Sequence, residues 1–297
     1  MKVLKRVIRV GMPSLLLFCA TLSHATDTLT RIKETQTITI AHREASVPFS
    51  YVVDNKPVGY AVDICLKVVD ALKKELKLPQ LKVNYLLVTP STRIAAIVDG
   101  KADLECGSTT NNAERRKTVS FTIPHFFAMT RMIVRADSGI KNWTDLRNKK
   151  VVTTKGTTTV KLLNDRDKVR ALSLRLVEGN DHDDSFKMVE NFQADAFPMD
   201  DVLLYGLRSG AKDPSKFIIV GDALSTEPYA MMMRKDDPAF KDFVDREVAR
   251  MMNDGEFTKL YDKWFRKPIP PKGANLNMPM GFLLRDNIRF PSDKVAD

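Results

Sequence analysis

Few side chains could carry out chemistry once residues 1–25 are set aside. Three histidines remain, His42, His125 and His182, and none belongs to a His-Glu-x-x-His zinc motif. The chain also lacks the Gly-x4-Gly-Lys-Ser/Thr loop of nucleotide hydrolases and the Gly-x-Ser-x-Gly turn that exposes a nucleophilic serine. These absences disfavour common hydrolytic chemistry, although an enzyme that uses carboxylates alone stays open. Binding without turnover is the favoured class of function.

Two cysteines follow residue 25, Cys65 and Cys106, and two interpretations of them are open. In an exported protein an even pair is a candidate disulfide. A bond that closes a loop of about forty residues would contribute a few kcal/mol of stability in the loop-entropy account. The alternative is a pair of buried free thiols.

Residues 1–25 have the composition of a secretory signal peptide. Its parts, in order, are a basic start, an apolar stretch and a small-x-small cleavage site: Lys2 to Arg9, Val10 to Ala20, and Ser23-His24-Ala25. The apolar stretch is much shorter than the roughly 20 residues that span a bilayer. We therefore expect a protein that is exported to the periplasm, with cleavage near Ala25.

Length and charge narrow the class of protein further. A chain of 297 residues with 43% hydrophobic and 28% charged residues is typical of a globular protein of about two domains. Without the four leader cations the chain keeps 43 Lys+Arg against 37 Asp+Glu, a net charge of +6. These charges alternate in sign, as in Lys73-Lys74-Glu75, so no nucleic-acid-binding surface is predicted.

Two successive stretches alternate strands with helices, which predicts an α/β protein of two units. The first unit has expected strands at 37–41, 82–88 and 102–105 and helices at 59–78 and 93–98. The second has expected strands at 131–134, 150–154, 172–177, 194–197 and 217–220 and helices at 157–163, 184–192 and 201–210. Helices are expected to dominate 240–265, and a largely irregular tail to begin at Pro268.

Seven groups of residues follow one another between positions 31 and 271. They are His42-Arg43-Glu44 with Val47-Pro48-Phe49-Ser50-Tyr51; Gly59-Tyr60-x-x-Asp63; Glu105-Cys106-Gly107-Ser108-Thr109-Thr110-Asn111-Asn112 with Glu114-Arg115; Gly156-Thr157-Thr158; Asp181-His182 with Asp184-Ser185-Phe186; Met199-Asp200-Asp201; and Gly255 to Phe265. Together they make the chain resemble the family 3 periplasmic solute-binding proteins of amino-acid ABC importers, in particular the glutamate/aspartate-binding members.

The resemblance implies a two-lobed periplasmic binding protein fold of type II. The first lobe would comprise 26–126 and 229–297, and the second lobe 131–224. The two hinge crossings would lie at about 127–130 and 225–228. Such lobes close on a ligand by hinge motion. The implied partners are L-glutamate or L-aspartate and a membrane-embedded ABC permease; a monomer without cofactor, metal or catalytic residues is expected.

The resemblance also implies how an acidic amino acid is held, because each of its three charges needs a partner in a dry cleft. Arg115 would bind the α-carboxylate and Asp200 the ammonium group. The side-chain carboxylate would be bound by Arg43, Arg93 and His182. Backbone N–H and hydroxyl groups would assist Arg115, from Ser108, Thr110, Thr157 and Thr158.

Several of these side chains have a simpler explanation that stays open. Arg93 could cap its own helix, and His182 could be a satisfied polar histidine. Asp200 is favoured over its neighbour Asp201 for the ammonium group, because Asp201 could be the N-cap of the following helix. Phe49 is either part of the core or an apolar wall beneath the ligand.

One departure from the family pattern affects the side-chain site. Close relatives have Thr-Ser-x-x-Arg where this chain has Thr89-Pro90-Ser91-Thr92-Arg93, so a ring without a donor replaces a serine hydroxyl. Ser91 could substitute from the next position.

The rival interpretation is a periplasmic dehydratase or lyase on the same fold, acting on a small carboxylic acid. It would need a free carboxylic acid that faces the substrate, and Glu44 and Asp201 are the candidates.

Overall fold

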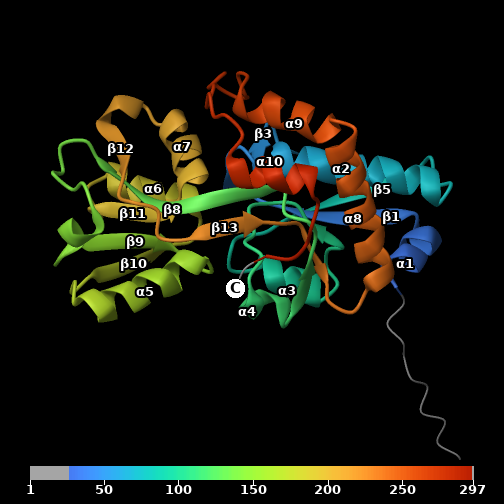
Figure 1. Ribbon diagram of the computed structural model, residues 1–297, viewed down its shortest axis with the longest axis horizontal. Coiled ribbons are helices and arrows are strands. Elements are labelled where there is room, and N and C mark those ends of the chain that lie inside the picture. The colour runs from blue at the N-terminus through green and yellow to red at the C-terminus, as the bar shows by residue number, and fades with distance from the viewer. Residues whose placement is uncertain (1–26, 296–297) are drawn as a thin grey trace, which may run out of the picture.

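The computed structural model of the protein describes residues 27–295. The predicted signal peptide, residues 1–25, lies outside the described residues. Within the described range no helix combines the length and the hydropathy that a membrane crossing needs. The described chain forms two lobes that lie side by side, each built on its own sheet (Figure 1).

The first lobe contains a five-stranded sheet and six of the helices. The strands are β1 (Thr37–His42), β5 (Lys82–Leu87), β6 (Leu104–Glu105), β7 (Val119–Phe121) and β14 (Met232–Arg234). The helices are α1 (Thr28–Thr35), α2 (Tyr60–Glu75), α3 (Arg93–Val98), α4 (Ala113–Arg116), α8 (Pro238–Asn253) and α9 (Glu256–Phe265). The strand order is β5-β1-β6-β14-β7, in which β1 is parallel to β5 and to β6.

The second lobe contains the other large sheet. Its strands are β8 (Phe126–Arg135), β9 (Lys150–Thr154), β10 (Arg175–Gly179), β11 (Ala196–Asp200), β12 (Phe217–Val220) and β13 (Thr226–Tyr229). Its helices are α5 (Thr158–Arg170), α6 (His182–Glu190) and α7 (Asp201–Gly210), with short 3₁₀ turns at Trp143–Leu146 and Pro214–Lys216. The order is β10-β9-β11-β8-β12, and β9 is parallel to β10 and to β11.

Two smaller parts complete the first lobe. A three-stranded antiparallel sheet follows β1 and consists of β2 (Ala45–Ser46), β3 (Ser50–Val53) and β4 (Lys56–Val58). Tyr51 of β3 stacks edge-on against Trp264 of α9, with ring centroids 6.0 Å apart. After α9 the chain ends in a tail that contains α10 (Phe282–Arg289).

The spacing of apolar residues explains where the helices form and what they cover. In α2, Ile64, Val68 and Leu72 recur at helical spacing and are fully buried, so this face packs on the sheet. One apolar cluster runs through both lobes, and two further clusters cover the other faces of the two sheets. Both large sheets are therefore buried on both faces, as parallel strands require.

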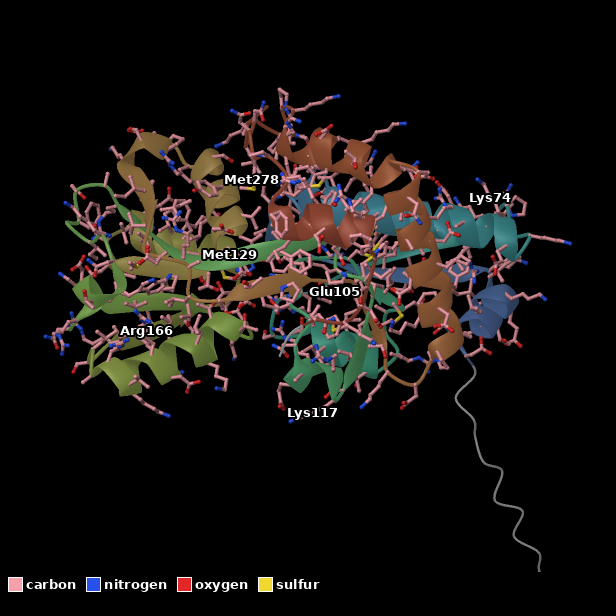
Figure 2. All side chains as sticks on the ribbon, in the orientation of Figure 1. Lys74, Glu105, Lys117, Met129, Arg166 and Met278 are labelled. Atoms are coloured by element: carbon pink, nitrogen blue, oxygen red, sulfur yellow. A yellow bond between two sulfur atoms is a disulfide. The ribbon has the colours of Figure 1, made fainter. Side chains whose placement is uncertain are left out.

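β8 and β13 form an antiparallel ribbon between the lobes, in the centre of Figure 1. Thr226 pairs with Met129 and Tyr229 pairs with Phe126; Met129 is labelled in Figure 2. The two segments predicted as hinges fall largely in this ribbon. Their exact limits, and those of the lobes, stay a prediction.

The α/β organisation is confirmed, whereas the bounds of two expected elements are wrong. The strand expected at 131–134 begins at Phe126, because its first residues pair with β13. The helix expected at 157–163 continues to Arg170 through a polar stretch that has no apolar period. The described tail is largely irregular, as expected, and contains one helix, α10, which packs against α8 and buries Leu284.

Cys65 and Cys106 are joined in a disulfide, which confirms that interpretation over free thiols. The bond ties α2 to the segment after β6, 41 residues further on. Replacing both cysteines by serine should lower the free energy of unfolding by about 2–4 kcal/mol, because the unfolded chain regains loop entropy. Urea denaturation measures this difference. Equal stability of the wild type with and without reductant would contradict the prediction.

Candidate ligand-binding site between the lobes

The predicted site residues lie just beyond the carboxyl ends of strands from both lobes. In the first lobe, β1 leads into Arg43 and β6 leads into the loop 106–112. In the second lobe, β9 leads into the start of α5, and β11 ends at Asp200. Ligands of α/β sheets bind at this end of parallel strands.

A small cavity of about 10 Å³ lies between these loops. Eight of the nine predicted residues line it: Arg93, Ser108, Thr110, Arg115, Thr157, Thr158, His182 and Asp200. Met199, which was not predicted, lines it as well. Arg43 does not line the cavity, but its guanidinium interacts electrostatically with that of Arg93 and with the Glu105 carboxylate.

Arg43 and Arg93 are buried, and some of their N–H donors have no hydrogen-bond partner among the described residues. Their exposed fractions are 1% and 2%. Nε and Nη1 of Arg43 and Nε of Arg93 have no hydrogen-bond partner among the described residues. Nη1 of Arg93 donates to Thr109 Oγ1 over 2.7 Å, which excludes a simple helix-capping role. Unpaired buried donors are costly, so this region is suited to an anion.

Burial and mutual repulsion disfavour the charged forms of these guanidinium groups. Burial, followed by the charge of Arg93, lowers the pKa of Arg43 to about 9. The same two causes lower the pKa of Arg115 to about 9. Burial also lowers the pKa of Arg93. An anion bound among the three would raise these pKa values again.

Glu105 is a buried carboxylate that sequence analysis gave no role. It lies in the interior of the molecule (Figure 2) and is fully buried. Its Oε2 accepts from Thr109 Oγ1 over 2.7 Å, and the same hydroxyl accepts from Arg93. Glu105 therefore holds the Arg93 guanidinium in place through Thr109. Its Oε1 has no partner among the described residues.

Arg115 links the two lobes. It belongs to α4, whose N-cap Asn112 accepts from the backbone N–H of Arg115 over 2.9 Å. Nη1 donates to Thr110 O of the first lobe over 2.9 Å, and Nη2 donates to Gly156 O of the second lobe over 3.3 Å. These two bonds fix the guanidinium at the cavity.

Asp200, rather than Asp201, faces the cavity. The Asp200 carboxylate accepts from Tyr229 Oη and, over 3.3 Å, from Thr130 Oγ1. Burial, followed by repulsion from Glu227, raises the pKa of Asp200 to about 8. An ammonium group beside it would restore the carboxylate form. Asp201 instead accepts the backbone N–H of Met129 over 3.1 Å.

His182 is the first residue of α6 and is fully buried at the cavity. Its Nδ1 lies 3.1 Å from Thr154 Oγ1. Burial, followed by the charges of Arg43 and Arg93, holds its pKa well below the usual range. His182 is therefore a neutral imidazole whose Nε2 remains for a ligand when Thr154 donates to Nδ1.

Glu227 is a second residue that sequence analysis missed. Its Oε2 accepts from Thr110 Oγ1 of the first lobe over 2.8 Å and from Thr158 Oγ1 of the second lobe over 2.9 Å. Ser225 donates to Oε1 over 2.5 Å. Only the folded arrangement reveals these partners, because Thr110 lies 117 residues from Glu227 in the sequence.

The hydroxyl groups predicted to assist Arg115 are therefore occupied by protein groups. Besides the two threonines bound to Glu227, Ser108 Oγ donates to Ser46 Oγ over 3.3 Å, and Thr157 Oγ1 donates to Thr154 O over 2.7 Å. The backbone offers an alternative. Thr157 is the N-cap of α5 but makes no side-chain capping bond, which leaves first-turn N–H groups suited to a carboxylate.

Two further expectations are settled by the packing. Ser91 does not line the cavity; its exposed side chain lies 2.9 Å from Thr89 Oγ1, so it does not replace the missing serine. Phe49 is fully buried and packs edge-on against Phe126 and Tyr229, with centroids 5.0 and 5.1 Å apart. Phe49 is part of the core.

The sequence is similar to known solute-binding proteins. Residues 38–267 match the family described as bacterial extracellular solute-binding proteins, family 3. The chain is 48% identical to an L-glutamate/L-aspartate-binding protein of Pseudomonas aeruginosa over 274 residues, 92% of this chain and 91% of the relative. It is 42% identical to a glutamate/aspartate import solute-binding protein of Escherichia coli, with 92% and 91% covered.

The fold has solved counterparts. A solute receptor for L-cysteine of Neisseria gonorrhoeae superimposes with a TM-score of 0.71 at 24% identity, over 80% of this chain and 92% of that structure. This similarity supports the two-lobed type II fold. The family match and the two relatives agree with it, and the chain belongs to family 3 of the bacterial extracellular solute-binding proteins.

Proposed function

We propose that this protein is the periplasmic receptor of an amino-acid ABC importer and that it captures L-glutamate or L-aspartate. The ligand is enclosed between the lobes when the β8–β13 ribbon bends, and the closed complex delivers it to the membrane permease. Lobe limits of 26–126 with 229–297 and 131–224, and removal of residues 1–25, belong to this proposal. The names of the two relatives support the choice of ligand.

One observation carries the proposal: the charges around the cavity match those of an acidic amino acid. Arg43 and Arg93 supply buried cations and Arg115 a half-buried one for two carboxylates, and Asp200 supplies an anion for one ammonium group. A neutral amino acid would bring no anion to the unpaired N–H donors of Arg43 and Arg93. Discrimination of this kind is large because buried polar groups stay unpaired.

We assign each charge of the ligand to one group of residues at the cavity. Arg115 and the first N–H groups of α5 bind the α-carboxylate. Asp200 binds the ammonium group. Arg93, with Arg43 behind it and neutral His182 beside it, binds the side-chain carboxylate.

The two carboxylic acids considered for the enzyme alternative do not face the cavity. Glu44 is exposed and lies in a surface groove, and Asp201 is bound to a backbone N–H group; neither lines the cavity. The relatives at 48% and 42% identity are solute-binding proteins. Binding without turnover is therefore the function that we propose.

The mature protein should bind L-glutamate or L-aspartate with a Kd of about 1 μM or lower, because every ligand charge finds a buried partner. L-glutamine should bind at least about 1,000-fold more weakly. Isothermal titration calorimetry measures both. Tight binding of another solute, with no heat from either acidic amino acid, would refute the choice of ligand.

Replacing Arg43 by methionine should weaken glutamate binding about 100-fold, since a buried partner of the side-chain carboxylate is lost. Glutamine has no carboxylate at this position, so its affinity should change less than about threefold. Titrating both ligands into the same variant supplies the internal control. Equal losses for the two ligands would place Arg43 outside the side-chain site.

Replacing Asp200 by asparagine should weaken binding of either acidic amino acid about 100-fold, because the ammonium group loses its anion. Asp201→Asn is the matched control, since the amide oxygen can still accept from Met129 and the residue lies off the cavity. Its affinity should stay within about threefold of wild type. A larger loss in Asp201→Asn than in Asp200→Asn would reverse the assignment.

A further inference from the structure

Two glycines of the second lobe touch the backbone of the first lobe where no side chain fits. A Cβ atom on Gly206 of α7 would lie 2.4 Å from Val47 O and 3.0 Å from Val47 C. A Cβ atom on Gly156 would lie 2.6 Å from Ser91 Cα and 2.8 Å from Pro90 C. The obstructing atoms are backbone atoms, which cannot turn aside as a flexible side chain can.

The two contacts lie in different regions of the lobe interface. Gly156 lies two residues before the first residue of α5, and Gly206 lies within α7. These two helices lie on opposite sides of the second sheet (Figure 1). Val47 connects β2 and β3 of the first lobe. At both places a glycine of the second lobe therefore packs directly against backbone atoms of the first lobe.

Of the two, Gly206 has no local need for glycine. Gly156 has a φ of +80°, a conformation that other residues rarely adopt, so its glycine is explained by the turn alone. Gly206 is helical, and alanine is favoured over glycine inside a helix. Its only evident constraint within the described residues is the contact with Val47.

We propose that Gly206 is a positioning residue for ligand capture: the missing side chain lets the lobes approach far enough to enclose the cavity. This inference rests on the proposed function, because it assumes that the lobes close on an amino acid. A methyl group at position 206 would hold Val47 away from α7. The charged groups of the two lobes would then not reach the same ligand together.

Gly206→Ala tests this inference, and Gly210→Ala is the matched control. Gly210 is the last residue of the same helix, and a Cβ atom there meets nothing within 4 Å. Gly206→Ala should weaken glutamate binding at least tenfold in calorimetry, while the melting temperature of the ligand-free protein stays level or rises. Gly210→Ala should bind like wild type.

Small-angle X-ray scattering separates this inference from the choice of ligand. With all twenty amino acids present, the radius of gyration should fall for wild type and Gly210→Ala but not for Gly206→Ala. If the mixture compacts the wild-type protein but neither glutamate nor aspartate does, the choice of ligand is refuted and the role of Gly206 is not. The inference would be overturned if Gly206→Ala bound glutamate and became compact as wild type does. It would also be overturned if the ligand-free variant lost stability in parallel with its loss of affinity.

Discussion

The rest of the structure depends on one constraint: three guanidinium groups meet between the lobes, and two of them, those of Arg43 and Arg93, are almost fully buried. Arg43, Arg93 and Arg115 have pKa values lowered by burial, and for Arg43 and Arg115 repulsion between arginines adds to this. Glu105 offsets part of the charge, yet N–H donors of Arg43 and Arg93 stay unpaired among the described residues. Closing such a cleft is costly unless a ligand brings negative charge into it.

This cost couples closure to the identity of the ligand. A ligand shifts the equilibrium between open and closed lobes only by as much as it binds one state better. The bonds that span the lobes, from Arg115 to Gly156 and from Thr110 to Glu227, give the closed state a fixed geometry. The ligand's carboxylates supply the remaining free energy, because they pair donors that are otherwise unsatisfied.

The sequence predicted the α/β class and the bounds of helices α3 and α7, and the family resemblance supplied eight of the nine residues that line the cavity. Arg93 and Asp200 could be found because each occurs in a motif that the family resemblance covers. Glu105 and Glu227 received no role, because their partners are hydroxyl groups that only the fold brings near. The hydroxyl groups of Thr110 and Thr158 donate to Glu227, so their part in ligand binding stays a prediction. The contact between Gly206 and the backbone of Val47 could not be predicted from the sequence, because the two residues are 159 positions apart.

A crystal structure of the protein, purified directly from its native cells without added ligand, tests the central claim most directly. The account predicts density for an acidic amino acid in the cavity, with its side-chain carboxylate about 3 Å from guanidinium nitrogens of Arg43 or Arg93. Its ammonium group should lie at a similar distance from the Asp200 carboxylate. A bound solute that leaves both arginines unpaired, or arginines that turn outward to bulk water in the closed protein, would contradict it.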